Sequence, residues 1–237
     1  MLALFFGSTN EGKLRELRRM VAGLPVRVVS PEELGRALPE VIEDGATFRQ
    51  NAEKKAAAYA RCAGMHALAD DSGLCVDALA GAPGVHSARW SELEDGLASP
   101  ACALPLVAAR ELGLELSRAA RDEANNDKLL SALAGTPDDR RGASYVAALA
   151  VAAPDGTIVA LAEGRCRGRI GHARRGTGGF GYDPLFVVDA PSPVGAPGGR
   201  TMAELDPAEK DAVSHRGAAF RALRPLLEKL AFDKNGG

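Results

Sequence analysis

The chain has 237 residues, of which 46% are hydrophobic, 25% charged and 5% aromatic. This composition is typical of a globular protein and excludes a disordered, collagen-like or disulfide-scaffold chain. With 29 basic and 31 acidic residues the net charge is −2, so no overall positive field would hold a nucleic acid or an anionic membrane surface.

Strands and helices alternate in the first half of the chain. Apolar residues at helical spacing predict a helix from about Asn10, with Gly23 as its C-cap. An alanine-rich helix is predicted to begin at Thr47, with Gln50 completing a capping box, and to end at Gly64. Short apolar runs predict strands at 2–6, 26–29, 66–69 and 74–79.

The second half combines helices with one clear hairpin. Helices are predicted near 100–112 and 122–134, and strands at 143–153, 157–163 and 185–188. A terminal helix begins behind Asp206 and Pro207, and residues 233–237 are expected to fray. The pattern indicates an α/β protein with a mixed sheet, formed as a single domain over residues 1–237 without an independent linker.

Cysteine usage and hydropathy place the chain in a reducing compartment. The four cysteines form no CxxC pair, so a zinc ribbon is not indicated. The apolar start at 1–6 is too short for a signal peptide, and no segment approaches the roughly 20 apolar residues of a membrane span. We expect a cytoplasmic protein that binds neither nucleic acid nor membrane.

The loop between the first strand and the first helix carries the first candidate site. Residues Ser8–Lys13 would place free backbone N–H groups, the helix dipole and the Lys13 ammonium around an anion. An ordinary turn with a surface lysine is the alternative. The spacing also matches most of a phosphate-binding P-loop, but Leu14 stands where an ATPase or kinase of that class needs Ser or Thr.

Two adjacent carboxylates form the second candidate site. Asp70 and Asp71 would end a predicted strand, where ligands bind in α/β sheets. Neighbouring carboxylates repel each other unless a cation or hydrogen bonds hold them, and Mg²⁺ prefers carboxylate and phosphate oxygens. A turn in which the aspartates cap backbone N–H groups is the alternative. The acidic stretch Glu40–Asp44 is turn-rich and reads as a solvated segment.

Two further candidates lie in the second half of the chain. The glycine-rich stretch Gly176–Pro184 lets the backbone approach a ligand closely, and Phe180 within it offers a stacking face for a base. A flexible loop with Phe180 tucked into the core is the alternative. Lys210 and the pair His215-Arg216 are donors suited to a phosphate or carbonyl oxygen, although a charged helix start would look the same.

Six short motifs follow one another along the chain. They are Ser8–Lys13, Thr47–Ala52, Ala69–Leu74, Gly84–Arg89, Gly178–Pro184 and Ser214–Gly217. In this order, from about Leu2 to Leu230, they resemble the inosine triphosphate pyrophosphatase (Ham1-like) family. The resemblance implies a long twisted mixed β-sheet flanked by helices, with two lobes and an active cleft between them. It also implies a homodimer that uses Mg²⁺ to hydrolyse ITP, dITP and XTP to the monophosphate and pyrophosphate, which removes deaminated purines from the nucleotide pool.

The resemblance also assigns roles to individual residues. Asp71 would be the catalytic proton acceptor with Asp70 beside it, and Asp71 and Glu43 would hold the metal. Substrate would be bound by Ser8, Thr9, Asn10, Glu11, Gly12, Lys13, Ser72, Phe180, Gly181, Tyr182, Asp183, Lys210, His215 and Arg216. Two adjacent acids are expected to titrate as a coupled pair, which leaves open whether Asp70 or Asp71 is the base. A nucleotide sensor without catalysis is a further alternative. The segments 93–121 and 189–200 depart from the family by their length, and no motif lies in them.

Overall fold

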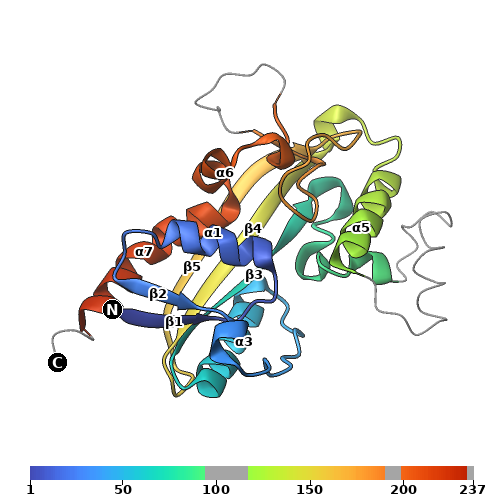
Figure 1. Ribbon diagram of the computed structural model, residues 1–237. Helices are drawn as coiled ribbons and strands as arrows, with labels where there is room; N and C mark the ends of the chain where they lie inside the picture. The colour runs from blue at the N-terminus through green and yellow to red at the C-terminus, as the bar shows by residue number, and fades with distance from the viewer. Residues whose placement is uncertain (94–116, 190–198, 234–237) are drawn as a thin grey trace. The chain divides into compact units, whose positions relative to one another are not determined.

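The computed structural model describes residues 1–93, 117–189 and 199–233 (Figure 1). A six-stranded sheet has the order β2-β1-β3-β4-β5-β6. The strands are β1 (Leu2–Phe6), β2 (Val26–Val29), β3 (His66–Val76), β4 (Gly142–Ala152), β5 (Ile158–Ile170) and β6 (Phe186–Val188). β1 pairs in parallel with β2 and β3, whereas β5 and β6 are antiparallel, which confirms the predicted mixed sheet with flanking helices.

The chain divides into two compact units. The first comprises Met1–Ser72, Val146–Arg165 and Pro207–Gly237, and the second comprises Gly73–Tyr145 and Cys166–Asp206. The helices of the first unit are α1 (Glu11–Met20), α2 (Pro31–Leu34), α3 (Phe48–Ala63), α6 (Pro207–Val213) and α7 (His215–Asp233). The described residues of the second unit hold α5 (Arg118–Ala132) and five short 3₁₀ turns, Asp77–Leu79, Gly84–His86, Trp90–Glu92, Asp138–Arg140 and Met202–Glu204. Among the described residues, no helix is both long and apolar enough to cross a membrane.

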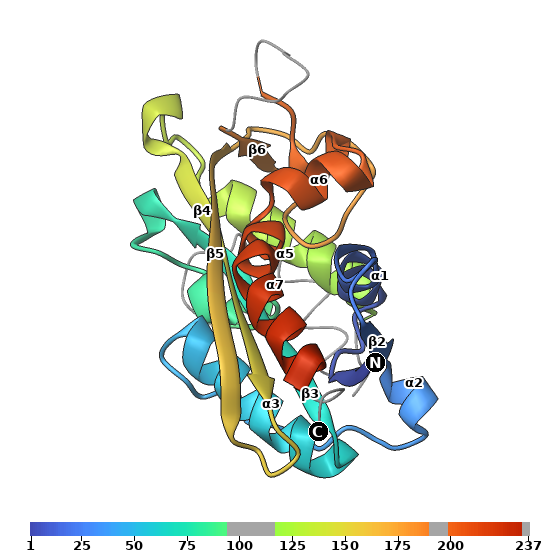
Figure 2. The same cartoon turned by 90° about the vertical axis from the view of Figure 1, so that its left-hand side faces the viewer.

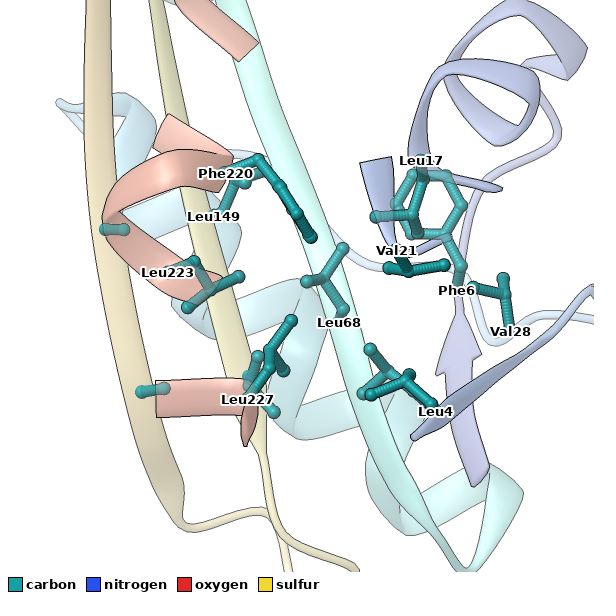
Figure 3. Packing of buried hydrophobic residues seen from close by; sticks show 14 of the residues in the cluster. Leu4, Phe6, Leu17, Val21, Val28, Leu68, Leu149, Phe220, Leu223 and Leu227 are labelled. Carbon is teal, nitrogen blue, oxygen red and sulfur yellow. The ribbon is translucent and has the colours of Figure 1, made fainter. Parts of the chain in front are cut away.

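In the first unit, helices cover both faces of the sheet (Figure 2). On one face, α1 with its cap residue Val21 and α7 supply Leu17, Val21, Phe220, Leu223 and Leu227 to a core that also contains Leu4, Phe6 and Leu68 from the strands (Figure 3). On the other face, α3 packs its alanines and Tyr59 against strand residues that include Phe5, Ala67 and Ala69. Burying such apolar surface contributes roughly 25 cal/mol per Å², so each helix is held mainly by its buried face.

The side-chain alternation along β3 decides where the two aspartates point. Leu68 belongs to the core beneath α1 and α7, whereas Ala67 and Ala69 belong to the core beneath α3. Successive side chains of a strand point to opposite faces of the sheet. Asp70 therefore continues the face of Leu68, and Asp71 continues the face of Ala69.

Side-chain caps fix the starts of the two helices that frame the site. The Asn10 side chain caps α1, and the Thr47 hydroxyl accepts a hydrogen bond from Gln50 N at 3.2 Å at the start of α3. The predicted capping box is only half formed, because Gln50 Oε1 accepts from Ala46 N at 2.8 Å. Gly64 caps the C-terminal end of α3, where the sequence predicted the helix to stop. It adopts a left-handed φ of +65°.

Some predicted elements differ from the structure. β3 runs without a break from His66 to Val76, so the predicted turn at 70–73 is wrong. Cations paired with Asp70 and Asp71 allow these carboxylates to lie inside a buried strand. α1 ends at Met20, and Gly23 lies beyond its cap. The helix predicted at 100–112 lies outside the described residues, as do most of 93–121 and 189–200 and all but Asp233 of the predicted frayed end.

Candidate active site

The Ser8–Lys13 loop is held by its own side chains. Ser8 Oγ accepts a hydrogen bond from Asn10 N at 3.2 Å, and Asn10 Oδ1 accepts from the backbone nitrogens of Gly12 and Lys13 at 2.9 and 3.3 Å. The expectation that these N–H groups are free is therefore wrong for Gly12 and Lys13, because the N-cap uses them. Ser8, Thr9 and Glu11 instead line a surface pocket on the first unit.

Asp70 anchors two cations on the α1 and α7 face of β3. Its Oδ1 lies 3.3 Å from Lys13 Nζ, and its Oδ2 accepts from Arg216 Nε at 2.5 Å. Arg216 Nη2 also donates to Ser72 Oγ at 3.1 Å, two residues further along the strand on the same face. Burial alone would raise the pKa of Asp70, but Arg216 and Lys13 outweigh it and hold this pKa far below its usual range.

Glu16 extends this arrangement to α6. Its carboxylate accepts a hydrogen bond from Arg216 Nη1, and its Oε1 lies 3.0 Å from Lys210 Nζ. Although burial opposes ionisation, Arg216 and Lys210 lower the pKa of Glu16. Three cations and two carboxylates are thus linked in one buried chain, which leaves one positive charge in excess. Such a group suits an anionic ligand.

A glycine sets the approach of α6 to α7 at this point. A Cβ on Gly217 would lie 1.9 Å from the backbone oxygen of Asp211, so only glycine allows the first turn of α7 to lie this close to α6. His215, which opens α7, is buried, and this burial together with Arg216 lowers its pKa well below the usual value. His215 is therefore a neutral imidazole at pH 7, with one donor and one acceptor nitrogen.

Asp71 faces a different set of residues, on the α3 side of β3. Lys55 Nζ lies 2.7 Å from Asp71 Oδ1 and 3.3 Å from Glu43 Oε2. Asn51 Nδ2 donates to Asp71 Oδ2 at 3.3 Å, and Asn51 Oδ1 accepts from Gly45 N at 2.8 Å, which ties the loop carrying Glu43 to α3. Asn51 and Lys55 are one helical turn apart and therefore share a face of α3.

The two aspartates consequently titrate differently. Burial raises the pKa of Asp71 even though Lys55 opposes it, whereas that of Asp70 is lowered. Asp70 and Asp71 lie on opposite faces of the sheet, so the expected coupling between them stays a prediction. The partner of Asp71 is Glu43, whose pKa is lowered because Lys55 and a hydrogen bond with Asp71 outweigh its burial.

Glu43 and Asp71 fit a divalent cation. Both carboxylates converge on one positively charged atom, Lys55 Nζ, within 3.3 Å. No cluster of three or more metal-ligating side chains occurs within the described part of the chain. Mg²⁺ is commonly held by one or two carboxylates, with substrate phosphates and water completing its coordination.

In the second unit, the Phe180–Asp183 stretch forms a tightly held loop. Phe180 is half-buried and its backbone N donates to Asp183 Oδ2 at 2.9 Å, whereas Tyr182 is buried and its hydroxyl donates to Ser87 O at 3.0 Å. Gly181 N donates to Asp122 Oδ2 at 2.8 Å. Phe180 is thus less buried than Tyr182 and Asp183, which hold the loop through their hydrogen bonds.

Comparison with known proteins identifies the family. A model of the Ham1 family matches residues 4–226. The chain belongs to the Ham1 family. It is 69% identical over 230 residues to a protein named dITP/XTP pyrophosphatase from Anaeromyxobacter dehalogenans, which covers 96% of this chain and 98% of that protein. A Streptomyces coelicolor protein of the same name is 43% identical over 97% of this chain and 99% of its own length.

Solved structures agree with this assignment. A HAM1 protein from Coxiella burnetii superposes with a TM-score of 0.73 at 34% identity, over 97% of this chain and 100% of that one. The Ham1 protein of Staphylococcus aureus gives a TM-score of 0.70 at 31% identity, over 96% of this chain and 98% of its own. The Ham1 architecture is therefore the fold of this chain.

Within the first unit, the structure brings seven of the residues that the Ham1 resemblance singled out into two clusters. Lys13, Asp70, Ser72, Lys210 and Arg216 form one cluster, and Glu43 and Asp71 form another. Three nitrogens of Arg216 already contact Asp70, Glu16 and Ser72, so its predicted contact with the base stays a prediction.

The sequence reasoning missed Glu16, Lys55 and the role of Asn51. A signal for two of them was present. Asn51 and Lys55 interrupt the alanine face of α3 that is otherwise buried at Ala52, Ala56 and Ala60. Polar residues on such a face are expected to have buried partners.

Proposed function

We propose that this Ham1-family chain is a nucleoside-triphosphate pyrophosphohydrolase that converts ITP, dITP and XTP to the monophosphate and pyrophosphate. The observation that carries this proposal is the division of β3 between two roles. Asp71 lies beside Glu43, Lys55 and Asn51 on one face, while Asp70 collects the cations that a triphosphate needs on the other. The names of relatives up to 70% identical support the choice of substrates.

Asp71 is the proton acceptor in this proposal. Without a metal, burial raises the pKa of Asp71, and a cation bound to the same carboxylate would lower it again. Its role as acceptor therefore rests on its position beside Asn51 and Glu43. Asp70 is unsuited to that role, since Arg216 and Lys13 hold its charge. Asn51, which donates to Asp71 Oδ2, would orient the carboxylate toward an attacking water.

Lys13 and Lys210 would neutralise the negative charge of the leaving group. Lys13 and Lys210 lie at the two ends of the buried charge chain, and in this proposal they bind the pyrophosphate leaving group. Preorganised cations of this kind stabilise the charge that develops as the phosphoanhydride bond between the α and β phosphates breaks. Ser8–Lys13 would contact the phosphates from the loop.

Mg²⁺ is the proposed metal, with Asp71 and Glu43 as its protein ligands. When bound, the ion would neutralise charge on the phosphate oxygens. Removal of divalent ions with a chelator is expected to abolish turnover, and added Mg²⁺ is expected to restore it. Glu43→Gln should raise the Mg²⁺ concentration for half-maximal rate by at least about 10- to 100-fold, because losing only a hydrogen-bond partner of a metal ligand already has an effect of that size. A rate that is unchanged by chelation would contradict the metal assignment.

Base selection follows from hydrogen-bond polarity. Hypoxanthine and xanthine present a 6-oxo acceptor, whereas adenine presents a 6-amino donor. A donor nitrogen of the neutral His215 would pair with the oxo group, and facing an amino group it would be left mispaired. Such a buried mismatch costs about 1–3 kcal/mol, or roughly 5- to 150-fold in rate. The half-buried Phe180 ring is the proposed stacking surface.

Product identity tests the proposal. With ITP, XTP and dITP we expect the monophosphate and pyrophosphate, detected by ion-exchange chromatography and a pyrophosphate assay. ATP, GTP and dTTP run in parallel would reveal the alternatives. Formation of a diphosphate and orthophosphate would instead support the P-loop ATPase alternative, and tight binding of ITP without any product would support the nucleotide sensor.

A homodimer located in the cytoplasm completes the proposal. Both properties come from the resemblance to the Ham1 family and from the sequence. Light scattering coupled to size-exclusion chromatography tests the first, since a dimer has twice the 24.6 kDa mass of one chain.

A further inference from the structure

Three side chains on one face of α5 contact the Phe180–Asp183 loop of the second unit. Arg118, Asp122 and Asn126 are spaced four residues apart and therefore lie in a row along the helix. Arg118 Cζ lies 5.8 Å from the centroid of the Phe180 ring. Asp122 Oδ2 accepts from Gly181 N at 2.8 Å, and Asn126 Nδ2 donates to Gly181 O at 2.9 Å.

Two hydrogen bonds from α5 hold both backbone polar groups of Gly181. Its backbone N–H and C=O are each bonded to α5, and its φ of +63° lies in the left-handed region that favours glycine. The Asn126 amide is itself oriented, because its Nδ2 also donates to Asp122 O at 2.9 Å, and the residue is only 1% exposed. α5 therefore dictates the path of the backbone directly after Phe180.

A loop this rich in glycine would otherwise be costly to order. Gly176, Gly179 and Gly181 all adopt positive φ, and glycine loses more conformational freedom on ordering than any other residue. Holding the loop in its binding conformation before the ligand arrives removes that cost from the binding free energy.

We propose that Arg118, Asp122 and Asn126 are positioning residues for the nucleobase of the substrate. They hold the Phe180 ring as a preformed stacking platform, with the Arg118 guanidinium against the ring and Gly181 fixed beside it. This inference rests on the proposed function, in which Phe180 stacks on a purine. In this inference α5 contributes to the binding of the base and does not contribute to the binding of the phosphates.

The test compares a ligand that has a base with one that has none. Calorimetric titrations with inosine monophosphate and with inorganic pyrophosphate are made on wild type, Asp122→Ala and Asn126→Leu. We expect the affinity for inosine monophosphate to fall about tenfold, the effect of losing one buried hydrogen bond. The affinity for pyrophosphate should stay within about twofold, since it binds without a base.

Two variants keep the test independent of folding. Arg118 is exposed, so Arg118→Ala removes its contact with the ring without opening the core, and a several-fold loss for inosine monophosphate alone is expected. Asp122→Asn keeps an oxygen acceptor for Gly181 N and should restore most of the affinity that Asp122→Ala loses. Asp127→Ala is the matched control, because Asp127 lies on the same helix but pairs with Arg174.

The outcomes separate this inference from the proposed function. Equal weakening of both ligands in the variants, or no weakening of either, overturns the positioning role. A wild-type protein that binds pyrophosphate but neither binds inosine monophosphate nor cleaves ITP overturns the proposed function, and that result appears before any substitution is made.

Discussion

Replacing Asp71 with asparagine is expected to abolish turnover and to leave the protein folded. The substitution removes the proposed proton acceptor and one of the two proposed metal ligands while keeping the size of the side chain. Loss of a general base alone lowers the rate by roughly 10²- to 10⁴-fold. We therefore expect kcat for ITP to fall at least about 10³-fold, measured by release of pyrophosphate.

The stability of Asp71→Asn should fall less than that of Asp70→Asn. Burial raises the pKa of Asp71, so its ionised form is disfavoured in the fold, and its contribution to stability decreases as the pH rises through that pKa. A neutral amide of the same shape removes the 2.7 Å ion pair with Lys55, whose pKa Asp71 helps to raise, but Lys55 retains Glu43 as a partner. The loss at pH 7 should therefore be smaller than for a carboxylate whose ionised form is favoured by the fold. Urea unfolding at pH 7 measures this directly.

Asp77→Asn provides a matched control for this prediction. Asp77 follows the same strand, but its carboxylate is half exposed and pairs with Arg167. The identical chemical change there should leave kcat within about twofold, because an exposed ion pair contributes only about 0–1 kcal/mol. Turnover of Asp71→Asn near the wild-type rate would remove Asp71 from its proposed role.

The sequence predicted the sheet class and most of the elements because their signals are local. The helix behind Asn10, the helix behind Thr47 and the hairpin of β4 and β5 depend on caps, periodicity and a turn, and the structure confirms all three. The predicted break at Asp70–Gly73 failed for a nonlocal reason. Two aspartates look like a turn until Arg216, 146 residues away, and Lys55, 16 residues away, are known to neutralise them.

The sequence predicted most of the residues that form the site, but it did not predict which cation pairs with which carboxylate. The motifs contain Asp70, Asp71 and Arg216, but which cation meets which carboxylate depends on the register of β3 between two helical layers. Glu16 is informative here, because it makes contacts as strong as any in the site and belongs to none of the quoted motifs. Only the packing of α1 against α6 and α7 shows that a carboxylate there holds two cations.

Asp70→Asn is expected to destabilise the protein strongly, in contrast to the same substitution one residue later. The Arg216 side chain is 4% exposed and would lose its ion pair with the Asp70 carboxylate, and Lys13 would lose the carboxylate that lies 3.3 Å from its Nζ. Removing one member of a buried ion pair leaves an uncompensated charge and typically costs about 3–5 kcal/mol. Urea unfolding at pH 7 should show this loss for Asp70→Asn and a smaller loss for Asp71→Asn.

The pH dependence identifies Asp70 as the origin of that loss. Its pKa in the folded protein lies far below the value of about 3.9 for an unfolded aspartate. The stabilisation by Asp70 is therefore complete above the unfolded pKa and declines as the pH falls toward the folded pKa. The difference in unfolding free energy between wild type and Asp70→Asn should be largest at neutral pH and shrink steadily below about pH 4. A constant difference from pH 7 to pH 2, or equal destabilisation by Asp70→Asn and Asp71→Asn, would contradict the assignment of opposite roles to the two faces of β3.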